Sequence, residues 1–216
     1  MQAPPINKVI LIDDHAVVRS GLRRLLEINK SIEVIAEGNS GEQAYQLYVD
    51  LRPDMVVMDL SMPGMGGLES AKRILARYPE AKIIMFSMHD TAAFASQALK
   101  AGVRGYVTKA GAADDLVQAV QDVAQGKTFM TADIAQKVAL LALLGDNNPM
   151  HLLSAREFEV FRLLAEGMRI EEIALTLKIS QKTVANYYTL LKQKLNINSP
   201  VELVRLAMKH GLIENQ

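Results

Sequence analysis

Five polar side chains stand at the ends of short apolar runs in the first half of the sequence. The runs are VILI at 9–12, MVVM at 55–58, KIIMFS at 82–87 and GYVTK at 105–109, and the side chains are Asp13, Asp14, Asp59, Ser87 and Lys109. A buried strand is most stable when it stays apolar, and a carboxylate at its tip is desolvated at a cost unless a cation lies nearby. The sequence therefore predicts that these side chains meet.

Three aspartates in one crevice repel one another unless they share a cation. Carboxylate oxygens are hard ligands, and an open site with two or three of them suits Mg²⁺, which prefers to share a phosphate. Lys109 adds a compact positive charge and Ser87 a hydroxyl donor, and both suit a tetrahedral oxyanion. The first run is followed by DDHAVVRSG rather than a Gly-rich phosphate cradle, which argues against a bound nucleotide. A covalent aspartyl phosphate is the better interpretation.

The elements that must position these side chains follow from the hydrophobic periodicity. Apolar runs at 9–12, 32–37, 55–58, 82–87 and 105–109 alternate with segments of helical spacing. Five strands alternating with five helices are typical of an α/β doubly wound sheet of five parallel strands. In such sheets the working groups gather at the carboxyl ends of the strands, which is where the five side chains are expected.

Gly126 is expected to end the fifth helix, and the strand signals stop beyond residue 149. Residues 131–144 are expected to form a mostly apolar helix, and GDNNP at 145–149 is typical of a linker. Capping boxes at Ser154 and Ser199 predict helix starts within a small all-α unit of four helices. We therefore expect a first domain at 1–126, a linker with a helix at 127–149, and a helical domain at 150–216.

Composition bounds the remaining function classes. The chain has 216 residues, 50% of them hydrophobic, which is enough for two packed domains. It has 24 basic and 24 acidic residues and no cysteine, which excludes a disulfide, a thiolate nucleophile and cysteine-ligated zinc. No apolar run approaches the ~18 residues of a membrane span, and the first residues lack the apolar core of a signal peptide. We expect a cytoplasmic protein without a membrane partner.

Residues 6–125 resemble a two-component receiver domain, which has a flavodoxin-like fold. The matching residues are Asp13, Asp14, Asp59 within DLSMPGMGG, Ser87, Tyr106 and Lys109. By this resemblance Asp59 accepts a phosphoryl group from a sensor histidine kinase, and Lys109 and Ser87 bind the phosphoryl oxygens. The implied metal site consists of Asp13 acting through water, Asp14, Asp59 and the carbonyl of Ser61. Tyr106 is the implied switch, which turns inward once Ser87 has moved to the phosphoryl group.

Ser61 and His89 flank this pocket in the sequence. In receivers these positions tune how long the phosphoryl group survives. Solvated loop residues would explain both side chains equally well, so the sequence leaves their role open.

Residues 150–213 resemble the LuxR-type helix-turn-helix, through LLSAREFEVFRLLAEGM, EEIALTLKIS and QKTVANYYTLLKQKLNI. Together the two resemblances make the chain similar to response regulators of the NarL/FixJ class. The second helix of such a motif enters the major groove of double-stranded DNA, and it is expected at 180–195. The predicted DNA contacts on it are Lys182, Thr183, Ala185, Asn186, Tyr188, Thr189, Lys192 and Lys194.

The leading hypothesis is a transcription regulator controlled by phosphorylation rather than an enzyme. In relatives the receiver can cover the recognition helix until phosphorylation loosens it, or phosphorylation produces a homodimer that binds paired half-sites, and the sequence favours neither route. The alternative is a phosphate-accepting adaptor whose helical domain binds protein rather than DNA. An aspartyl-phosphate phosphatase would need a second acid two residues after the nucleophile, where Ser61 stands.

Overall fold

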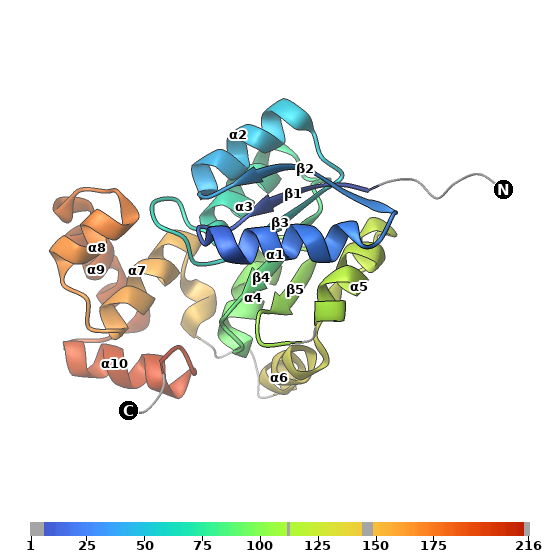
Figure 1. The fold of residues 1–216 in the computed structure, drawn as a ribbon. Coiled ribbons are helices and arrows are strands. Elements are labelled where there is room, and N and C mark those ends of the chain that lie inside the picture. The colour runs from blue at the N-terminus through green and yellow to red at the C-terminus, as the bar shows by residue number, and fades with distance from the viewer. Residues whose placement is uncertain (1–6, 112, 144–148, 214–216) are drawn as a thin grey trace.

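The computed structural model describes residues 7–111, 113–143 and 149–213, which form a parallel sheet flanked by helices and a separate group of helices (Figure 1). The strands are Asn7–Ile12 (β1), Ile32–Gly38 (β2), Met55–Met58 (β3), Ile83–Ser87 (β4), Gly105–Thr108 (β5) and Phe129–Met130 (β6). Their spatial order is β2-β1-β3-β4-β5-β6, and every neighbouring pair is parallel. Strand β2 lies on one side of β1 and β3 lies on the other, so the order of the strands changes direction after β2, as in doubly wound sheets.

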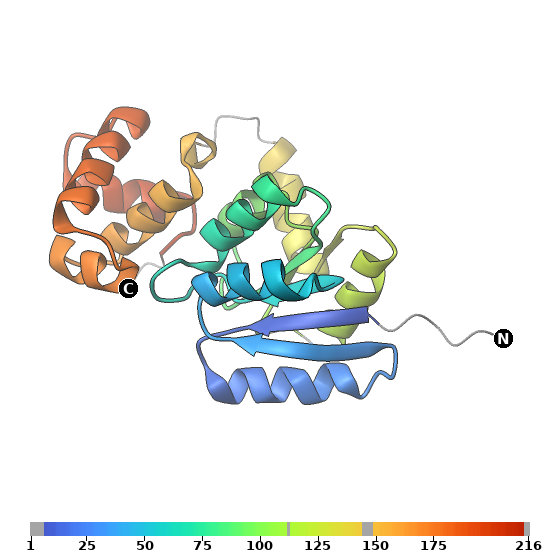
Figure 2. The ribbon, with the colours of Figure 1, turned by 90° about the horizontal axis from the view of Figure 1, so that it is seen from above.

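Helices cover both faces of the sheet, as the alternating pattern predicts. They are Ala16–Glu27 (α1), Gly41–Leu51 (α2), Gly67–Arg77 (α3), Ala92–Lys100 (α4) and Ala113–Ala124 (α5). Helices α1 and α5 pack on one face, where Leu26 and Leu116 are buried, and α2, α3 and α4 pack on the other, where Ile74 and Phe94 are buried. Figure 2 shows α1 on the side of the sheet opposite to α2 and α3. The predicted fold class is confirmed.

The described part of the sheet has six strands, so the expectation of five was one strand short. Phe129 and Met130 lie within the segment expected to be a linker, and they pair with Gly105 and Tyr106 of β5. An edge strand leaves a row of backbone groups unpaired, and β6 satisfies part of that row on β5.

The predicted helix of the linker is present as α6 (Ala132–Leu143). It packs beside α4, and its Ile134 is fully buried. Residues 127–143 of the expected linker therefore belong to the packed sheet part. Four of the five residues of GDNNP lie at 145–148, outside the described residues.

Within residues 149–213 the structure has a short 3-10 helix and, as expected, four α-helices. They are Pro149–Leu152 (η1), Ala155–Ala165 (α7), Ile170–Leu177 (α8), Gln181–Leu195 (α9) and Pro200–Lys209 (α10). The capping box at Ser154 is complete, because Ser154 and Glu157 each accept the backbone N–H of the other. At Ser199 only half of the box forms, since Glu202 accepts from the Asn198 N–H instead. None of the described helices is long and apolar enough to cross a membrane.

The helical part lies against the loop that follows β3 (Figures 1 and 2). In this loop the Gly64 N–H donates to the Thr176 carbonyl of α8 at 2.7 Å. Arg156 of α7 donates through Nη1 to the Gly64 carbonyl at 3.0 Å. The carboxyl edge of the sheet is therefore the side that faces the helical part.

Candidate functional site

The carboxyl ends of β1, β3 and β5 bring the predicted charged side chains into one pocket. The Nζ atom of Lys109 donates to Asp13 Oδ2 at 2.7 Å and to Asp59 Oδ2 at 2.8 Å. Asp13 and Asp59 are only 1% and 4% exposed, and the Lys109 side chain is 9% exposed. The burial of two carboxylates is thus offset by one shared cation, which is the partner that the sequence required.

Backbone hydrogen bonds beyond the strands determine where these side chains start. The Asp59 N–H donates to the Ile12 carbonyl at 2.7 Å, and the Lys109 N–H donates to the Ser87 carbonyl at 2.7 Å. Each parallel ladder therefore extends by one residue, to the residue that carries the functional group. The candidate site is held by the sheet rather than by a free loop.

Gly67, the first residue of α3, lies very close to the Asp59 backbone. A Cβ atom added at Gly67 would lie 2.0 Å from the Asp59 carbonyl oxygen. The Gly67 N–H also donates to the Leu60 carbonyl at 2.9 Å. Helix α3 can begin against Asp59 only because residue 67 has no side chain.

An acidic cluster surrounds the ammonium group of Lys109. Asp13, Asp14, Asp59 and His15 each offer one ligand atom, and these atoms lie within 4.8 Å of one another. Asp14 Oδ1 is buried, and no hydrogen bond of good geometry reaches it from the described residues. Three carboxylates form the hard donor set that Mg²⁺ prefers, so the residues present fit that ion.

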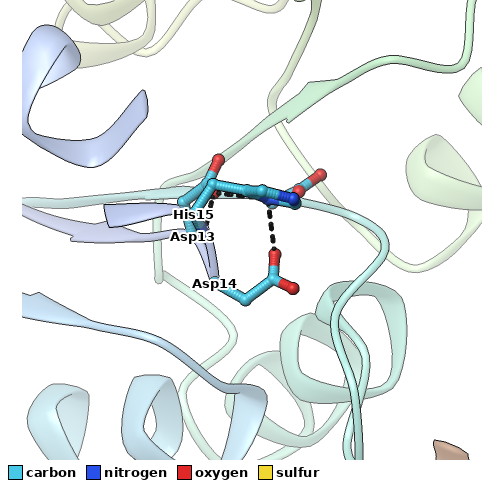
Figure 3. Close-up of side chains that lie close together, drawn as sticks. Asp13, Asp14 and His15 are labelled. Atoms are coloured by element: carbon cyan, nitrogen blue, oxygen red, sulfur yellow. Dashed lines mark hydrogen bonds and ion pairs between the residues drawn. The ribbon is translucent and has the colours of Figure 1, made fainter. Parts of the chain in front are cut away.

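His15 belongs to this cluster, although it is not one of the site residues predicted from the sequence. Figure 3 shows its ring beside the two aspartates that follow β1. Its Nδ1 lies 3.0 Å from Asp14 Oδ1 and 3.4 Å from Asp13 Oδ1. The available signal was its position directly after the acidic pair, but a residue three places beyond a strand has no direction that periodicity could predict.

The hydroxyl groups of the predicted site gather around His89. Ser87 is fully buried, and its Oγ accepts the His89 backbone N–H at 3.1 Å. Ser61 Oγ lies 2.9 Å from His89 Nε2, and the Ser61 N–H donates to Asp59 Oδ1 at 3.4 Å. The Tyr106 hydroxyl donates to the His89 carbonyl at 2.8 Å. The fully buried Tyr106 ring thus already occupies the inward position that the resemblance assigned to the phosphorylated state.

The environment shifts the pKa values of the two central groups. Burial raises the pKa of Asp59, and the hydrogen bond from Lys109 only partly opposes this shift. Burial by itself lowers the pKa of Lys109, but its hydrogen bonds to Asp13 and Asp59 outweigh that effect and the pKa is raised. The lysine therefore stays charged, while the Asp59 carboxylate is less stable than it would be in water.

Asp59→Asn is expected to stabilise the protein when no Mg²⁺ is present. A carboxyl whose pKa is raised on folding binds its proton more tightly in the folded chain, so its ionised form costs stability at pH values above the unfolded pKa. Removal of the charge should raise the Tm by roughly 2–4 °C at pH 7 in EDTA, equivalent to about 1 kcal/mol. The gain should shrink as the pH falls through the range in which Asp59 is protonated.

Thermal unfolding followed by circular dichroism at neutral and acidic pH measures this effect. Asp50→Asn, on the exposed face of α2, is the matched control and should change the stability by less than about 0.5 kcal/mol. A lower Tm for Asp59→Asn at neutral pH would contradict the sign of the pKa shift.

Helix α9 presents most of the predicted DNA contacts on its outward face. Val184 and Leu191 are fully buried against the other helices, as predicted. The exposed outward residues are Lys182, Ala185, Asn186 and Thr189, and the half-buried ones are Thr183, Tyr188 and Lys192. Lys194 is exposed as well, but its Nζ donates to the Glu157 carboxylate at 2.7 Å. The charge of Lys194 is therefore already compensated within the helical part.

In the described residues, the sheet part contacts α7, α8 and η1 rather than the outward face of α9. Phe94 of α4 packs on Phe158 of α7, and Gln97 of α4 donates to the Met150 carbonyl of η1. Of the two routes that the sequence left open, direct covering of the recognition helix is not the arrangement seen here.

The chain matches known families in both of its parts. Residues 9–121 match the family described as the response regulator receiver domain, and residues 151–207 match the family described as bacterial regulatory proteins of the luxR family. The chain therefore belongs to the response regulators of the NarL/FixJ class, which are phosphorylation-controlled DNA-binding transcription regulators.

Several known response regulators match this chain over nearly its whole length. The response regulator UvrY of Escherichia coli strain K12 is 38% identical over 206 residues, which cover 94% of each chain. The response regulator GacA of Pseudomonas syringae pv. syringae is 35% identical, with 96% of this chain and 98% of GacA covered. The solved structure of RcsB from Salmonella enterica serovar Typhimurium, bound to promoter rprA in the presence of the phosphomimetic BeF3−, has a TM-score of 0.69 and 28% identity, and the match covers 93% of this chain and 98% of that one.

Proposed function

We propose that Asp59 is the phosphoacceptor of this response regulator and that its phosphorylation changes how the helical domain binds DNA. The observation that carries the proposal is the position of Lys109, whose ammonium group lies 2.7 Å from Asp13 and 2.8 Å from Asp59. A cation held in a buried pocket beside a carboxylate is preorganised to bind the oxygens of a phosphoryl group on that carboxylate.

The transfer forms one bond and breaks one. A carboxylate oxygen of Asp59 bonds to phosphorus while the phosphorus–nitrogen bond of a phosphohistidine in the sensor kinase breaks, and the nitrogen keeps the electron pair. Lys109 stays with the phosphoryl oxygens, and Ser87 donates its hydroxyl to one of them. The proposed holders of Mg²⁺ are Asp13, Asp14, Asp59 and the Ser61 carbonyl. When bound, Mg²⁺ offsets the negative charge that the phosphoryl group adds.

The same proposal assigns roles to the parts of the chain. Residues 1–126 are the receiver domain, 127–149 the connection with its helix, and 150–216 the DNA-binding domain. The pairing of β6 with β5 supports a connection whose first half moves with the receiver. The proposed partners of the protein are a sensor histidine kinase and double-stranded DNA. The protein is proposed to act in the cytoplasm, where it can meet both. The protein acts as a regulator rather than as an enzyme.

Helix α9 is the proposed recognition helix. Lys182 and Lys192 meet phosphates, Asn186 reads an adenine edge, and Ala185 and Thr189 contact thymine methyl groups. Thr183 and Tyr188 line the rim of this surface. Lys194 contributes least, because it is paired with Glu157.

Lys182→Ala is expected to weaken DNA binding about equally for all sequences. Loss of one phosphate contact releases one counterion fewer, so the slope of log K against log salt should fall by about 1. Fluorescence anisotropy with a labelled duplex over a range of salt concentrations measures the slope. Lys8→Ala, an exposed lysine of β1, is the control and should leave the slope unchanged. An unchanged slope for Lys182→Ala would remove this residue from the DNA interface.

A homodimer formed on phosphorylation is part of the proposal. Helix-turn-helix proteins commonly bind two half-sites with two copies, so phosphorylation that favours dimers also favours DNA binding. Light scattering after size-exclusion chromatography, with and without a phosphodonor, measures this step. If the phosphorylated protein keeps the molar mass of a monomer in this measurement, the proposed dimer is contradicted.

The test of the function combines phosphoryl transfer with DNA binding. Wild-type protein incubated with acetyl phosphate and Mg²⁺ should take up one phosphoryl group and change its affinity for DNA, whereas Asp59→Asn should do neither. Phosphate-affinity gels measure uptake, and a salt-dependent gel shift measures affinity. Phosphoryl uptake without any DNA binding would instead support the adaptor that binds protein, and uptake by Asp59→Asn would remove Asp59 from the mechanism.

A further inference from the structure

His89 makes a polar contact with each part of the candidate switch. Its backbone N–H donates to Ser87 Oγ at 3.1 Å, and its carbonyl accepts the Tyr106 hydroxyl at 2.8 Å. Its ring nitrogen Nε2 lies 2.9 Å from Ser61 Oγ. One residue in the loop after β4 is therefore bonded to groups on β4, on β5 and on the loop after β3.

The His89 ring also begins a series of aromatic contacts that reaches the helical domain. The ring is stacked on Phe94, with centroids 3.9 Å apart and planes 9° from parallel. Phe94 in turn meets Phe158 of α7 edge to face, with centroids 5.2 Å apart and planes at 87°. Both phenylalanines are almost fully buried. Such aromatic pairs stabilise a contact beyond the burial of their area.

Burial holds the His89 ring in its neutral form. It lowers the pKa of His89 to about 4, and the positive charge of Arg162 on α7 acts in the same direction, with Asp90 opposing it. A neutral ring can stack on Phe94 without the cost of a buried charge, and it can accept the Ser61 hydroxyl proton or donate to its oxygen, according to its tautomer.

The loop after β3 also contacts the helical domain through hydrogen bonds. Gly64, in the loop after β3 that also carries Ser61, is bonded to Thr176 and Arg156 of the helical domain. Movement of the loop after β3 is therefore passed directly to the domain contact, whereas movement of His89 reaches it through Phe94 of α4.

We propose that His89 is a positioning residue that couples phosphorylation of Asp59 to the docking of the DNA-binding domain, through the stack His89–Phe94–Phe158. The inference rests on the proposed phosphorylation of Asp59. When Ser87 turns to a phosphoryl oxygen, its Oγ leaves the His89 N–H, and the loop after β4 loses one of its anchors. The ring then shifts on Phe94, and the contact of Phe94 with Phe158 is weakened.

Two substitutions at this position should have different effects. His89→Phe keeps an aromatic ring on Phe94 and the backbone N–H that donates to Ser87 Oγ, so docking and its release on phosphorylation should stay close to those of the wild type. His89→Ala removes the stack, so docking should be weakened before phosphorylation. Met88→Ala, at the neighbouring residue with 69% exposure, is the matched control.

The first readout is the change in DNA affinity that acetyl phosphate produces, measured with a duplex selected by this chain from a random-sequence library. If the wild type responds by about tenfold, a typical coupling, His89→Phe should respond to within about twofold of that value at equal phosphoryl uptake. His89→Ala without phosphodonor should bind with nearly the affinity of the phosphorylated wild type. Met88→Ala should behave as the wild type.

The second readout is the distance between the domains, and it needs no phosphoryl transfer. Because the chain has no cysteine, spin labels can be placed on Glu33→Cys of β2 and Lys209→Cys of α10 alone. His89→Ala should show, without phosphodonor, the broadened distance distribution of the phosphorylated wild type.

The outcomes separate the inference from the proposed function. Wild-type distances and a wild-type DNA affinity in unphosphorylated His89→Ala, or a His89→Phe variant that behaves as His89→Ala, would overturn the inference alone. A wild type that neither takes up the phosphoryl group nor changes its DNA affinity would overturn the proposed function, and the inference with it.

Discussion

Lys109→Ala should lower the free energy of unfolding by about 3–5 kcal/mol in buffer without Mg²⁺. The Lys109 ammonium is the cation that contacts both Asp13 and Asp59, and both carboxylates are almost completely buried. Without it, two ionised groups remain close together in a medium of low polarity, and neither can reach water without moving the strands that carry them. Urea unfolding followed by circular dichroism measures the loss.

Two further measurements distinguish this cause from a loss of packing. Millimolar Mg²⁺ should restore part of the stability, because a divalent cation replaces the missing charge, and acidification should restore part of it because protonated carboxyls need no counter-charge. Lys127→Ala is the control: it also breaks an ion pair, with Asp122, but that lysine is largely exposed, and the loss should stay below about 1 kcal/mol. Equal losses in the two variants would show that the pocket charges are not specially coupled.

Gly67→Ala should have the second-largest effect, a loss of about 3 kcal/mol together with slower phosphoryl uptake. The new methyl group would lie 2.0 Å from the carbonyl oxygen of Asp59 and 2.9 Å from its carbonyl carbon, and both are backbone atoms that cannot rotate away. Either α3 or the end of β3 must shift, and a shift of β3 moves the phosphoacceptor away from Lys109.

Gly21→Ala is the matched control for this substitution. Gly21 lies in α1, and an added Cβ would meet nothing within 4 Å. Since alanine is the better helix former, this variant should be more stable than the wild type by about 0.5–1 kcal/mol. Thermal unfolding and the rate of acetyl phosphate uptake, measured on both variants, test the pair. Normal stability and uptake in Gly67→Ala would show that the backbone at Asp59 can yield.

The pocket charges could be predicted from the sequence because each of them ends an apolar run. A parallel sheet brings all strand ends to one edge, so Asp13, Asp59 and Lys109 had to be close together whatever the helices did. The burial of Val184 and Leu191 was predicted equally well from their spacing. In all these cases a local pattern and the global fold demand the same arrangement.

Other features left no local signal. Strand β6 has two residues, too few to show a period of two, and only the open edge of β5 explains it. The pair of Lys194 with Glu157 joins residues on two different helices, and a charge pattern read along α9 alone cannot reveal it.

The contact between the domains was also beyond the sequence. Phe94 and Phe158 each fit the apolar face of their own helix, so each could be assigned to the core of its own domain. That the two rings touch depends on how the domains dock, which amphipathic spacing does not encode.

The packing of β6 and α6 on the sheet leaves a short tether, because only the residues between Leu143 and Pro149 join the two domains. Even fully extended, those six peptide steps reach at most about 21 Å. Because the connection is so short, the effective concentration of a released domain at its docking surface is on the order of millimolar. A lasting release therefore requires weaker docking contacts, because distance alone cannot keep the domain away from that surface.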